Sequence, residues 1–491
     1  MKIKIDKIII VSLAIFICCT YSTSAFAQKM TMSECMQKAV DNNKYLKASD
    51  YAIEIRKGEK KSMFGKFLPV VKTEANVLGW DDDLVMDLGI DLSGFSGMFG
   101  LFEELVGNPL VQSMLSKETL EQAAGLSTLK EELAGMDTSI KMRDNFTAQA
   151  SVMVAQPLTQ LYQVYSGYWA NKELQYSAEK DYEAARNELE LNVARAYIGL
   201  VTATQMKETA EAGLTQIDAY VKQVQAYLDA EIVERNALLK VQVKKADVQK
   251  SLYMTEKGIK IAKATLNLLM GRELNTPLEP VINESPIDPQ KALDVRLKVQ
   301  QRYAIEERPE LLSARHKKEA ARAGRHAAIG AMLPEISGIF KYEYSYGFGA
   351  TQPENLYFGG LVLSWDAWEW GATYYKLKAA EAQQKQAEYL VEYANDGIRL
   401  DVETKRYELE ESLKSLTVAE KQLEQVTENL RIEQIRYEVN ETTTTDLLDA
   451  QTKELKARNE AIVARMKVRH AHYSLLSAMG RDLLVSIKDN K

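Results

Sequence analysis

Two aspartates stand three residues apart next to a run of threonines near the C-terminus, and they are the first candidates for a functional role. Asp446 and Asp449 follow the four threonines of the stretch VNETTTTDLLDA, residues 439–450. Consecutive threonines are poor helix formers, whereas the chain on both sides is charged and helical in character. One interpretation is structural. Asp446 would cap a new helix, and Asp449 would complete the cap three residues later, where an acid suits the helix dipole.

No other group of reactive side chains points to catalysis. The sequence contains no nucleophile elbow, phosphate loop or metal-ligand cluster. His470 and His472 lie on opposed faces of a predicted helix and cannot share a metal, so all four histidines are expected to be ordinary surface residues. The acidic run Asp81–Asp83 lacks the spacing and glycine of a calcium loop and is expected in a solvated loop. We therefore predict a protein without enzymatic activity and without a cofactor.

Composition and the N-terminus indicate an exported protein. The 491 residues are 46% apolar and 27% charged, which excludes a disordered chain and a protein with many membrane-spanning helices. A net charge of −7 argues against nucleic acid as a partner. Lysines precede the short apolar run Ile8–Cys19, and the cleavage signal Ala25–Ala27 follows, so residues 1–27 are predicted to be a signal peptide. Cys18 and Cys19 leave lipidation open as an alternative.

Proline placement predicts very long helices. No proline occurs between Pro157 and Pro277 or after Pro353, and both spans are rich in alanine, glutamate, lysine, glutamine and leucine. A helix from about residue 372 to 437 would be about 100 Å long at 1.5 Å per residue. This length exceeds an ordinary globular core and implies a coiled coil or a helical tube.

The sequence also repeats itself. LMGREL at residues 269–274 matches AMGRDL at 478–483, and Tyr227 matches Tyr437 just before a break in each half. The offset between the two halves stays near 210 residues, so the chain consists of two copies of one unit.

Each copy contains two segments with the alternation of a half-buried strand. The clearest is PEISGIFKYEY, in which Tyr342 and Tyr344 alternate with charged residues, and Trp365 and Trp368 lie near the end of the next strand. Alternation over about ten residues with aromatic girdles at both ends is typical of outer-membrane strands, although a soluble hairpin packed on a helix has a similar pattern. Because four strands cannot enclose a lumen and lipid forbids open edges, three or more chains would share one barrel.

These features resemble the TolC family of outer-membrane efflux proteins. The resemblance rests on the duplicated unit, on RPELLSARHKKEAARAGRHAAIGAMLPEISG at residues 308–338, and on RYEVNETTTTDLLDAQTKELKARNE at residues 436–460. It implies a mostly helical α+β fold of two tandem repeats. It also implies a homotrimer with a shared 12-stranded transmembrane β-barrel in the outer membrane and an α-helical barrel in the periplasm.

The resemblance also assigns a domain division and a function. The expected parts are a signal peptide at 1–27; a first repeat at 28–275 with strands at about 69–79 and 146–156, a long loop at 80–145 and helices within 158–270; an equatorial linker at 276–304; and a second repeat at 305–491 with strands at about 334–346 and 356–366 and helices at 371–437 and 446–480. The implied function is a passive exit duct of a tripartite efflux pump or type I secretion system. Its partners would be a periplasmic adaptor and an inner-membrane transporter of RND or ABC type.

Site residues follow from the same resemblance. Asp446, Asp449 and Tyr437 fall where relatives place the pore constriction. The hairpin tips would dock the adaptor through Asn440, Glu441, Thr442, Thr443, Leu228 and Glu231, and the girdle of Trp365, Trp368, Tyr342 and Tyr344 would contact outer-membrane lipid. The competing interpretation is a periplasmic adaptor or coiled-coil scaffold, which also carries long helical hairpins. For the insert at 80–145 the sequence suggests a cap or plug of the barrel.

Overall fold

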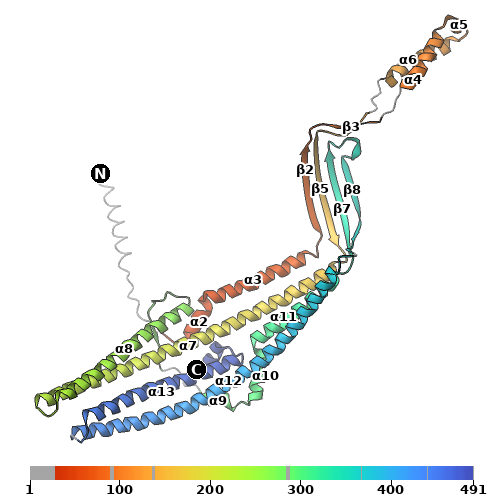
Figure 1. Ribbon diagram of the computed structural model, residues 1–491. Helices are drawn as coiled ribbons and strands as arrows, with labels where there is room; N and C mark the ends of the chain where they lie inside the picture. Colours follow the sequence, from red (N-terminus) through yellow and green to blue (C-terminus); the bar gives the residue numbers. More distant parts are fainter. Residues whose placement is uncertain are drawn as a thin grey trace, which may run out of the picture. The chain divides into compact units, whose positions relative to one another are not determined.

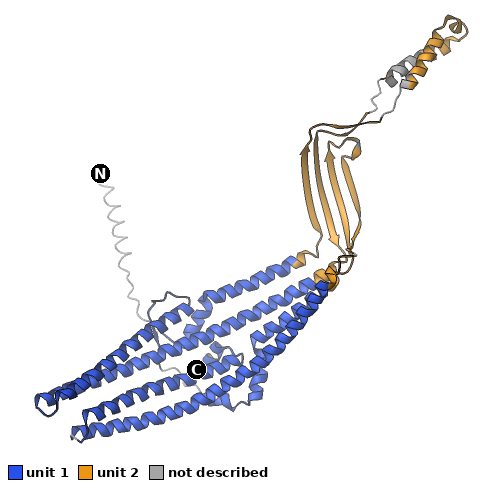
Figure 2. Ribbon diagram, in the orientation of Figure 1, with its two compact units in different colours: residues 1–62, 166–326, 375–491 blue, residues 63–165, 327–374 orange. Residues whose placement is uncertain are grey.

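The chain folds into two compact units with a mostly helical α+β composition (Figures 1 and 2). The helical unit comprises residues 1–62, 166–326 and 375–491, and the strand unit comprises residues 63–165 and 327–374. The computed structural model describes residues 28–88, 93–134, 139–282, 288–366, 368–439 and 441–489. The predicted signal peptide lies outside these residues.

Two very long helices dominate the helical unit. The helix α7, Leu161–Asp229, has 69 residues, and α12, Ala372–Glu438, has 67, so each is about 100 Å long. Each continues through a short turn into a shorter partner, α8 (Arg235–Leu269) or α13 (Thr444–Ala478). No described helix combines the length and apolarity that a membrane crossing requires. The unit also contains β1 (Gln28–Met30), α2 (Met32–Asn42), α3 (Lys44–Gly65), β6 (Leu278–Pro280), α9 (Pro289–Asp294), α10 (Leu297–Glu307), α11 (Pro309–Gly330) and α14 (Leu483–Asp489).

The strand unit is built on a four-stranded antiparallel sheet in the order β2-β5-β7-β8. Its strands are β2 (Val70–Gly79), β5 (Phe146–Pro157), β7 (Glu335–Tyr346) and β8 (Asn355–Ser364), with the short 3-10 helix η1 (Gly349–Thr351) before β8. The register places Val152 opposite Tyr342, and Tyr342 opposite Tyr357. Consecutive residues of each strand therefore alternate between the two faces of the sheet.

The segment predicted as a long loop is instead structured. Strands β3 (Leu84–Asp87) and β4 (Ser139–Arg143) form a two-stranded sheet, and α4 (Ser93–Gly107), α5 (Pro109–Gln112) and α6 (Lys117–Ala134) follow between them. Helix α6 reads KETLEQAAGLSTLKEELA, a sequence of good helix formers. We call residues 80–145 the insert. The acidic run Asp81–Asp83 is exposed, as expected.

The structure also extends the predicted repeat. The first copy has the order α2-α3-β2-β5-α7-α8, and the second has the order α10-α11-β7-β8-α12-α13. The second copy therefore begins at Leu297, inside the predicted linker, and the rest of that linker contains β6 and α9.

Tyr197 ties the N-terminal strand to the core of the helical unit. Its side chain is fully buried, and its hydroxyl donates to the carbonyl of Met30 at 3.0 Å and accepts from the N–H of Val281 at 2.9 Å. Strands β1 and β6 run parallel beside it. The core around it includes residues of α2, α7, α8, α13 and α14.

The duplicated GR dipeptide marks two equivalent helix ends. After α8, Gly271 has φ +66°, its N–H donates to Leu268, and the next N–H donates to Asn267. After α13, Gly480 has φ +78° and the same pair of bonds. This arrangement is the Schellman motif, which needs a left-handed residue at that position. The sequence repeat thus records a shared backbone geometry.

We expect Gly271→Ala to destabilise the helical unit by about 2 kcal/mol or more. The left-handed conformation is strained for alanine, and its Cβ would lie 2.6 Å from the carbonyl oxygen of Asn42. The matched control is Gly258→Ala within α8, where the nearest atom is Ala203 Cβ at 3.9 Å. That change is expected to be neutral or to stabilise by about 0.5 kcal/mol. Thermal unfolding followed by circular dichroism measures both, and equal melting temperatures would contradict the prediction.

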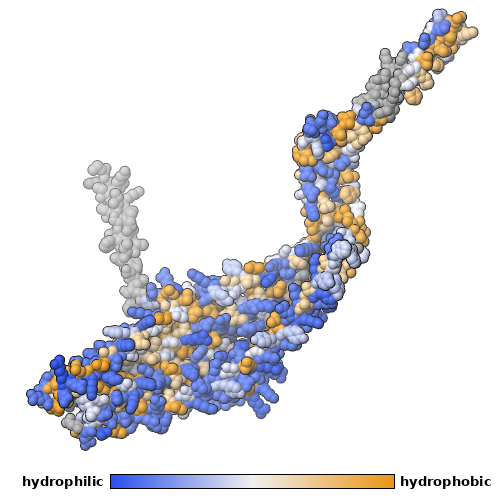
Figure 3. Space-filling model, viewed as in Figure 1, coloured by the Kyte–Doolittle hydropathy of each residue, from blue (hydrophilic) through white to orange (hydrophobic). Residues whose placement is uncertain are grey.

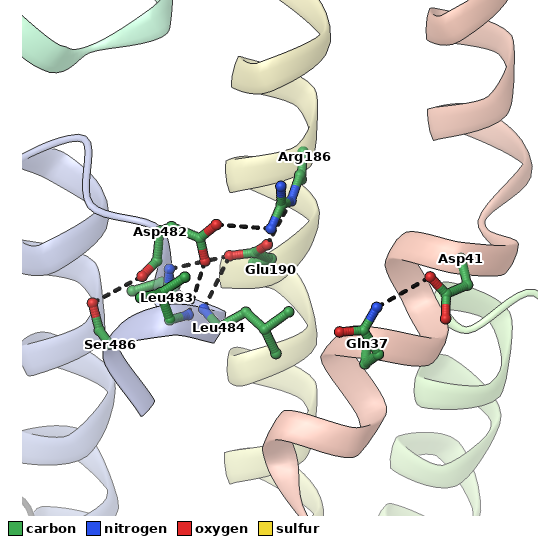
Figure 4. Close-up of polar contacts among 9 residues, drawn as sticks. Gln37, Asp41, Arg186, Glu190, Asp482, Leu483, Leu484 and Ser486 are labelled. Carbon is green, nitrogen blue, oxygen red and sulfur yellow. Dashed lines mark hydrogen bonds and ion pairs between the residues drawn. The ribbon is translucent and has the colours of Figure 1, made fainter. Parts of the chain in front are cut away.

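The last helix is attached to α7 by a buried carboxylate (Figure 4). Glu190 accepts from the main-chain N–H groups of Leu483 and Leu484, at 3.1 and 3.3 Å. Arg186 bridges the two acids, because its Nε donates to Glu190 at 3.0 Å and its Nη2 donates to Asp482 at 2.7 Å. Glu190 therefore satisfies N–H groups at the start of α14 that have no partner within the helix.

Candidate functional site

The candidate site is the end of the helical unit where the two long hairpins turn. The α7–α8 and α12–α13 turns lie side by side at the same end (Figure 1), and Lys240 of α8 donates to the Thr445 hydroxyl of α13 at 3.0 Å. Both turns close with the same bond, from Ile232 N–H to the Tyr227 carbonyl and from Glu441 N–H to the Arg436 carbonyl, each 2.8 Å. We call residues 228–236 and 437–449 the tip.

The helix cap at the tip differs from the predicted one. Helix α13 begins at Thr444, and its N-cap is Thr443 rather than Asp446. The Thr443 hydroxyl accepts from the N–H of Asp446 at 3.2 Å and donates to the Asp446 carboxylate at 2.6 Å. Asp446 thus occupies the third helical position of a complete capping box. Thr443 is the N-cap because, in this register, the Asp446 carboxylate accepts a hydrogen bond from the main-chain N–H of Thr443. Asp449 therefore takes no part in the cap.

The two acids at the tip are open to solvent. Asp446 and Asp449 are both exposed. The hydroxyl of Thr443 holds the pKa of the Asp446 carboxyl below its ordinary value, and the main-chain N–H of Thr443 adds to this effect. Asp446 therefore stays ionised at a pH where a free aspartate begins to protonate.

Tyr437 is buried behind the acids. Its side chain is 6% exposed and packs among Leu447, Ala450 and Tyr227, whose ring centroid lies 6.4 Å away. Its hydroxyl shares a hydrogen bond of 3.2 Å with that of Thr444. The repeat-matched tyrosines therefore contact each other and join the two hairpins, and the described protomer does not present the Tyr437 ring on its surface.

The predicted docking residues divide by exposure. Glu231, Glu441 and Thr443 are exposed, while Thr442 and Leu228 are half-buried. Asn440 lies outside the described residues. Glu231 has φ +57°, a strained value for a non-glycine residue, which its place in a tight turn explains. Sequence reasoning missed two exposed apolar side chains of the tip, Ile232 and Val439, whose signal is an apolar residue inside a polar turn.

The predicted girdle residues lie on or beside one face of the four-stranded sheet. Tyr342 and Tyr344 are exposed on this face, and Tyr342 stacks on Tyr357 with ring centroids 5.7 Å apart. Trp365 and Trp368 follow the far end of β8 and are both exposed. The same face carries exposed Phe340, Val152, Val71, Val77, Leu361 and Leu363. Within the described residues of the protomer, this large apolar surface has no partner.

The opposite face of the sheet holds most of its polar side chains, although β8 adds exposed Leu356, Phe358 and Val362 to it. Lys341 pairs with Glu343, and Gln149 donates to Glu343 at 2.5 Å. Lys72, Glu74 and Asn76 of β2 point to the same side, as the register requires. One face is therefore mostly apolar, and the charged side chains of the sheet gather on the other face.

The histidines differ in part from the sequence expectation. His472 is buried, and its Nδ1 has no hydrogen-bond partner, whereas His316 contacts Glu173 at 2.7 Å through Nδ1. Burial lowers the pKa values of His470 and His472. Within the described residues, no group of three His, Cys, Asp or Glu side chains could hold a metal ion.

Comparison with known proteins finds one matching family and several similar structures. Residues 302–481 match the family described as outer membrane efflux protein. A membrane protein from Pseudomonas aeruginosa has a TM-score of 0.72 at 16% identity, covering 93% of this chain and 92% of its own. The CmeC outer membrane channel of Campylobacter jejuni has a TM-score of 0.71 at 14% identity, covering 94% and 89%. The outer membrane protein VceC of Vibrio cholerae has a TM-score of 0.71 at 14% identity, covering 92% and 96%. No curated protein sequence matches the chain.

The family match covers the second repeat, and the solved structures share the fold of the chain. The predicted resemblance to the TolC family of outer-membrane efflux proteins is confirmed, on a family match that covers residues 302–481. Of the two interpretations of the sequence, the comparisons support the outer-membrane efflux channel and not the periplasmic adaptor.

Proposed function

We propose that this protein is the passive exit duct of a tripartite efflux pump or type I secretion system, and that it works as a homotrimer. The observation that carries the proposal is the four-stranded sheet, with an exposed apolar face, a more polar opposite face and two unpaired edges. The other parts of the proposal follow from that sheet and from the family.

The two edges of the sheet lead to the trimer. Strands β2 and β8 each have one partner in the sheet. Lipid cannot satisfy free backbone N–H and C=O groups, so both edges must pair with another copy. Three copies joined β2 to β8 give a closed barrel of 12 strands, and a barrel of this size leaves room for a lumen. The polar face of each sheet would line this lumen.

The aromatic residues would set the barrel in the membrane. Tyr342 and Tyr344 lie toward the hairpin end of β7, and Trp365 and Trp368 follow the opposite end of β8. Tyrosine and tryptophan favour the two membrane–water interfaces. We propose that these residues contact outer-membrane lipid. Residues 1–27 would direct export and would be removed after Ala27.

The tip would form the periplasmic entrance. We propose that Asp446 and Asp449 of three copies form acidic rings around a pore constriction, and that Tyr437 positions them by joining the hairpins. Rings of carboxylates favour cations over anions. The exposed tip residues Glu231, Glu441 and Thr443 would dock a periplasmic adaptor, together with Thr442, Leu228 and Asn440. An inner-membrane transporter of RND or ABC type would supply the energy.

The test is whether the apolar face of the sheet meets lipid. The mature wild-type protein is expected in the outer-membrane fraction and to give discrete conductance steps in a planar bilayer. Leu361→Lys places a charge near the middle of that face and should destabilise the inserted barrel by about 2–4 kcal/mol. The matched control is the neighbouring Val362→Lys, which points to the opposite, more polar face and should still insert and conduct.

Two results would contradict this assignment. If the wild type is folded and trimeric but is extracted with soluble periplasmic proteins, it is not an outer-membrane channel. If Leu361→Lys and Val362→Lys insert equally well, the apolar face does not contact lipid.

A further inference from the structure

Among the residues that the structure describes, the insert carries an exposed apolar helix face. In α4, Phe95, Met98, Phe102 and Leu105 are each 53–63% exposed. Their spacing of three, four and three residues is the a/d pattern of a coiled coil. Apolar residues gather on the helical part of the insert in Figure 3. We call these four residues the α4 seam.

The described packing within the insert leaves this seam exposed. Helix α4 packs against α6. The half-buried apolar residues of α4 are Phe99 and Val106, one heptad apart on the flank of the seam. Leu101 on the other flank is exposed as well and widens the apolar surface. An exposed apolar stripe of this kind marks an interaction site.

We propose that the three α4 seams pack on one another in the trimer and close a short helical bundle at the end of the barrel opposite Pro157. This inference rests on the proposed trimer, and the occupant of each seam is a second copy of this chain. Position in the fold favours this occupant. The insert follows directly from β2, the edge strand that would pair with β8 of a neighbouring copy.

Charge disfavours a lipid surface as the occupant. Residues 93–134 contain six glutamates and two lysines. Helices that lie on membranes usually carry lysine and arginine on the polar face, which attract anionic lipid. An acidic insert would be repelled by such a surface.

Because the barrel would hold the three helices close together, a short seam would be enough to form the bundle. The seam spans less than the three or four heptads that indicate an independent coiled coil in a sequence. Strand pairing in the barrel would raise the effective concentration of the three helices to about the millimolar range. The seam then needs to supply only a small further free energy. Because the bundle would stand over one end of the lumen, it would restrict exit there.

Cysteine cross-linking of the full trimer tests the proposal. Met98→Cys places a thiol in the seam, and Glu104→Cys is the matched control on the far side of the same helix. The native Cys35 is buried and contributes little background. After mild oxidation, Met98→Cys should give about tenfold more disulfide-linked dimer than Glu104→Cys, because only the seam is held close to its copies.

A second variant separates the possible outcomes. Phe102→Glu places three like charges in the bundle, so it should abolish cross-linking of the Met98→Cys background and raise the single-channel conductance. If the protein is trimeric and conducting but Met98→Cys cross-links no more than the control, the proposal is overturned and the channel function stands. A disulfide from Met98→Cys to another protein in place of its own copy would overturn it too. If no trimer forms at all, the proposed function fails first.

Discussion

Replacing Asp446 and Asp449 by asparagine will remove the preference of the pore for cations. We expect the ratio of cation to anion permeability to fall about tenfold, which corresponds to about 1.4 kcal/mol. The physical reason is that three copies would place six carboxylates around one entrance, and such rings concentrate cations. Asparagine keeps the size of the side chain and an acceptor oxygen, so the cap of α13 survives. Reversal potentials in a salt gradient across a planar bilayer measure the ratio.

The control separates the charge from the cap. Thr443→Ala removes the N-cap, which should weaken the start of α13 by about 1 kcal/mol, but it keeps both acids. Selectivity at pH 7 should therefore stay at the wild-type value. If the double asparagine variant remains as selective as the wild type, the acids do not line the constriction.

The pH dependence of the cation selectivity tests the role of Asp446 on its own. In Asp449→Asn only Asp446 remains, and its pKa is lowered by the Thr443 hydroxyl. A carboxyl with a lowered pKa keeps its charge above that pKa and loses it as the pH falls through it. Selectivity should thus persist to lower pH in Asp449→Asn than in Asp449→Asn combined with Thr443→Ala, where the hydroxyl is gone.

The tip shows how far sequence reasoning reaches. The pattern located the turn and the acids, because a threonine run between charged helical segments is a local signal. It placed the N-cap three residues too late, since serine, threonine and aspartate all serve as N-caps and only the returned bond to Thr443 decides between them. The repeat matched Tyr227 with Tyr437. Their direct contact depends on how two hairpins pack, and no local pattern contains that information.

The strands were predicted well from the sequence, whereas the helix of the insert was not. The four strands of the sheet begin and end within two residues of the predicted bounds, because alternation with a period of two is strong along each strand. Helix α4 was missed because Gly94, Gly97 and Gly100 lower its helix propensity, and packing on α6 compensates. His472 was expected to be an ordinary surface histidine, but α13 packs on other helices over much of its length and the structure buries it.

Glu190 carries no sequence signal at all, yet removing it should have a large effect. It is one glutamate among many on helix faces, and its partners at Leu483 and Leu484 are almost 300 residues away. We expect Glu190→Ala to lower the free energy of opening α14 by about 3 kcal/mol, because two buried N–H groups lose their acceptor and Arg186 loses one of its two carboxylates. Hydrogen exchange of the α14 amides measures this free energy.

The matched control is Glu188→Ala, which removes an exposed glutamate two residues earlier on the same helix and should leave α14 protected.

The pH dependence gives an independent check. Burial raises the pKa of Glu190, and the charge of Asp482 adds to the rise. A carboxyl with a raised pKa contributes stability that is complete below its unfolded value near 4.5 and is lost as the pH rises through the folded value. The advantage of the wild type over Glu190→Ala should therefore be larger at pH 5 than at pH 8. Equal protection of α14 in the two alanine variants would show that the carboxylate does not hold the helix, and an advantage that grows with pH would show that its charged form is the one that binds.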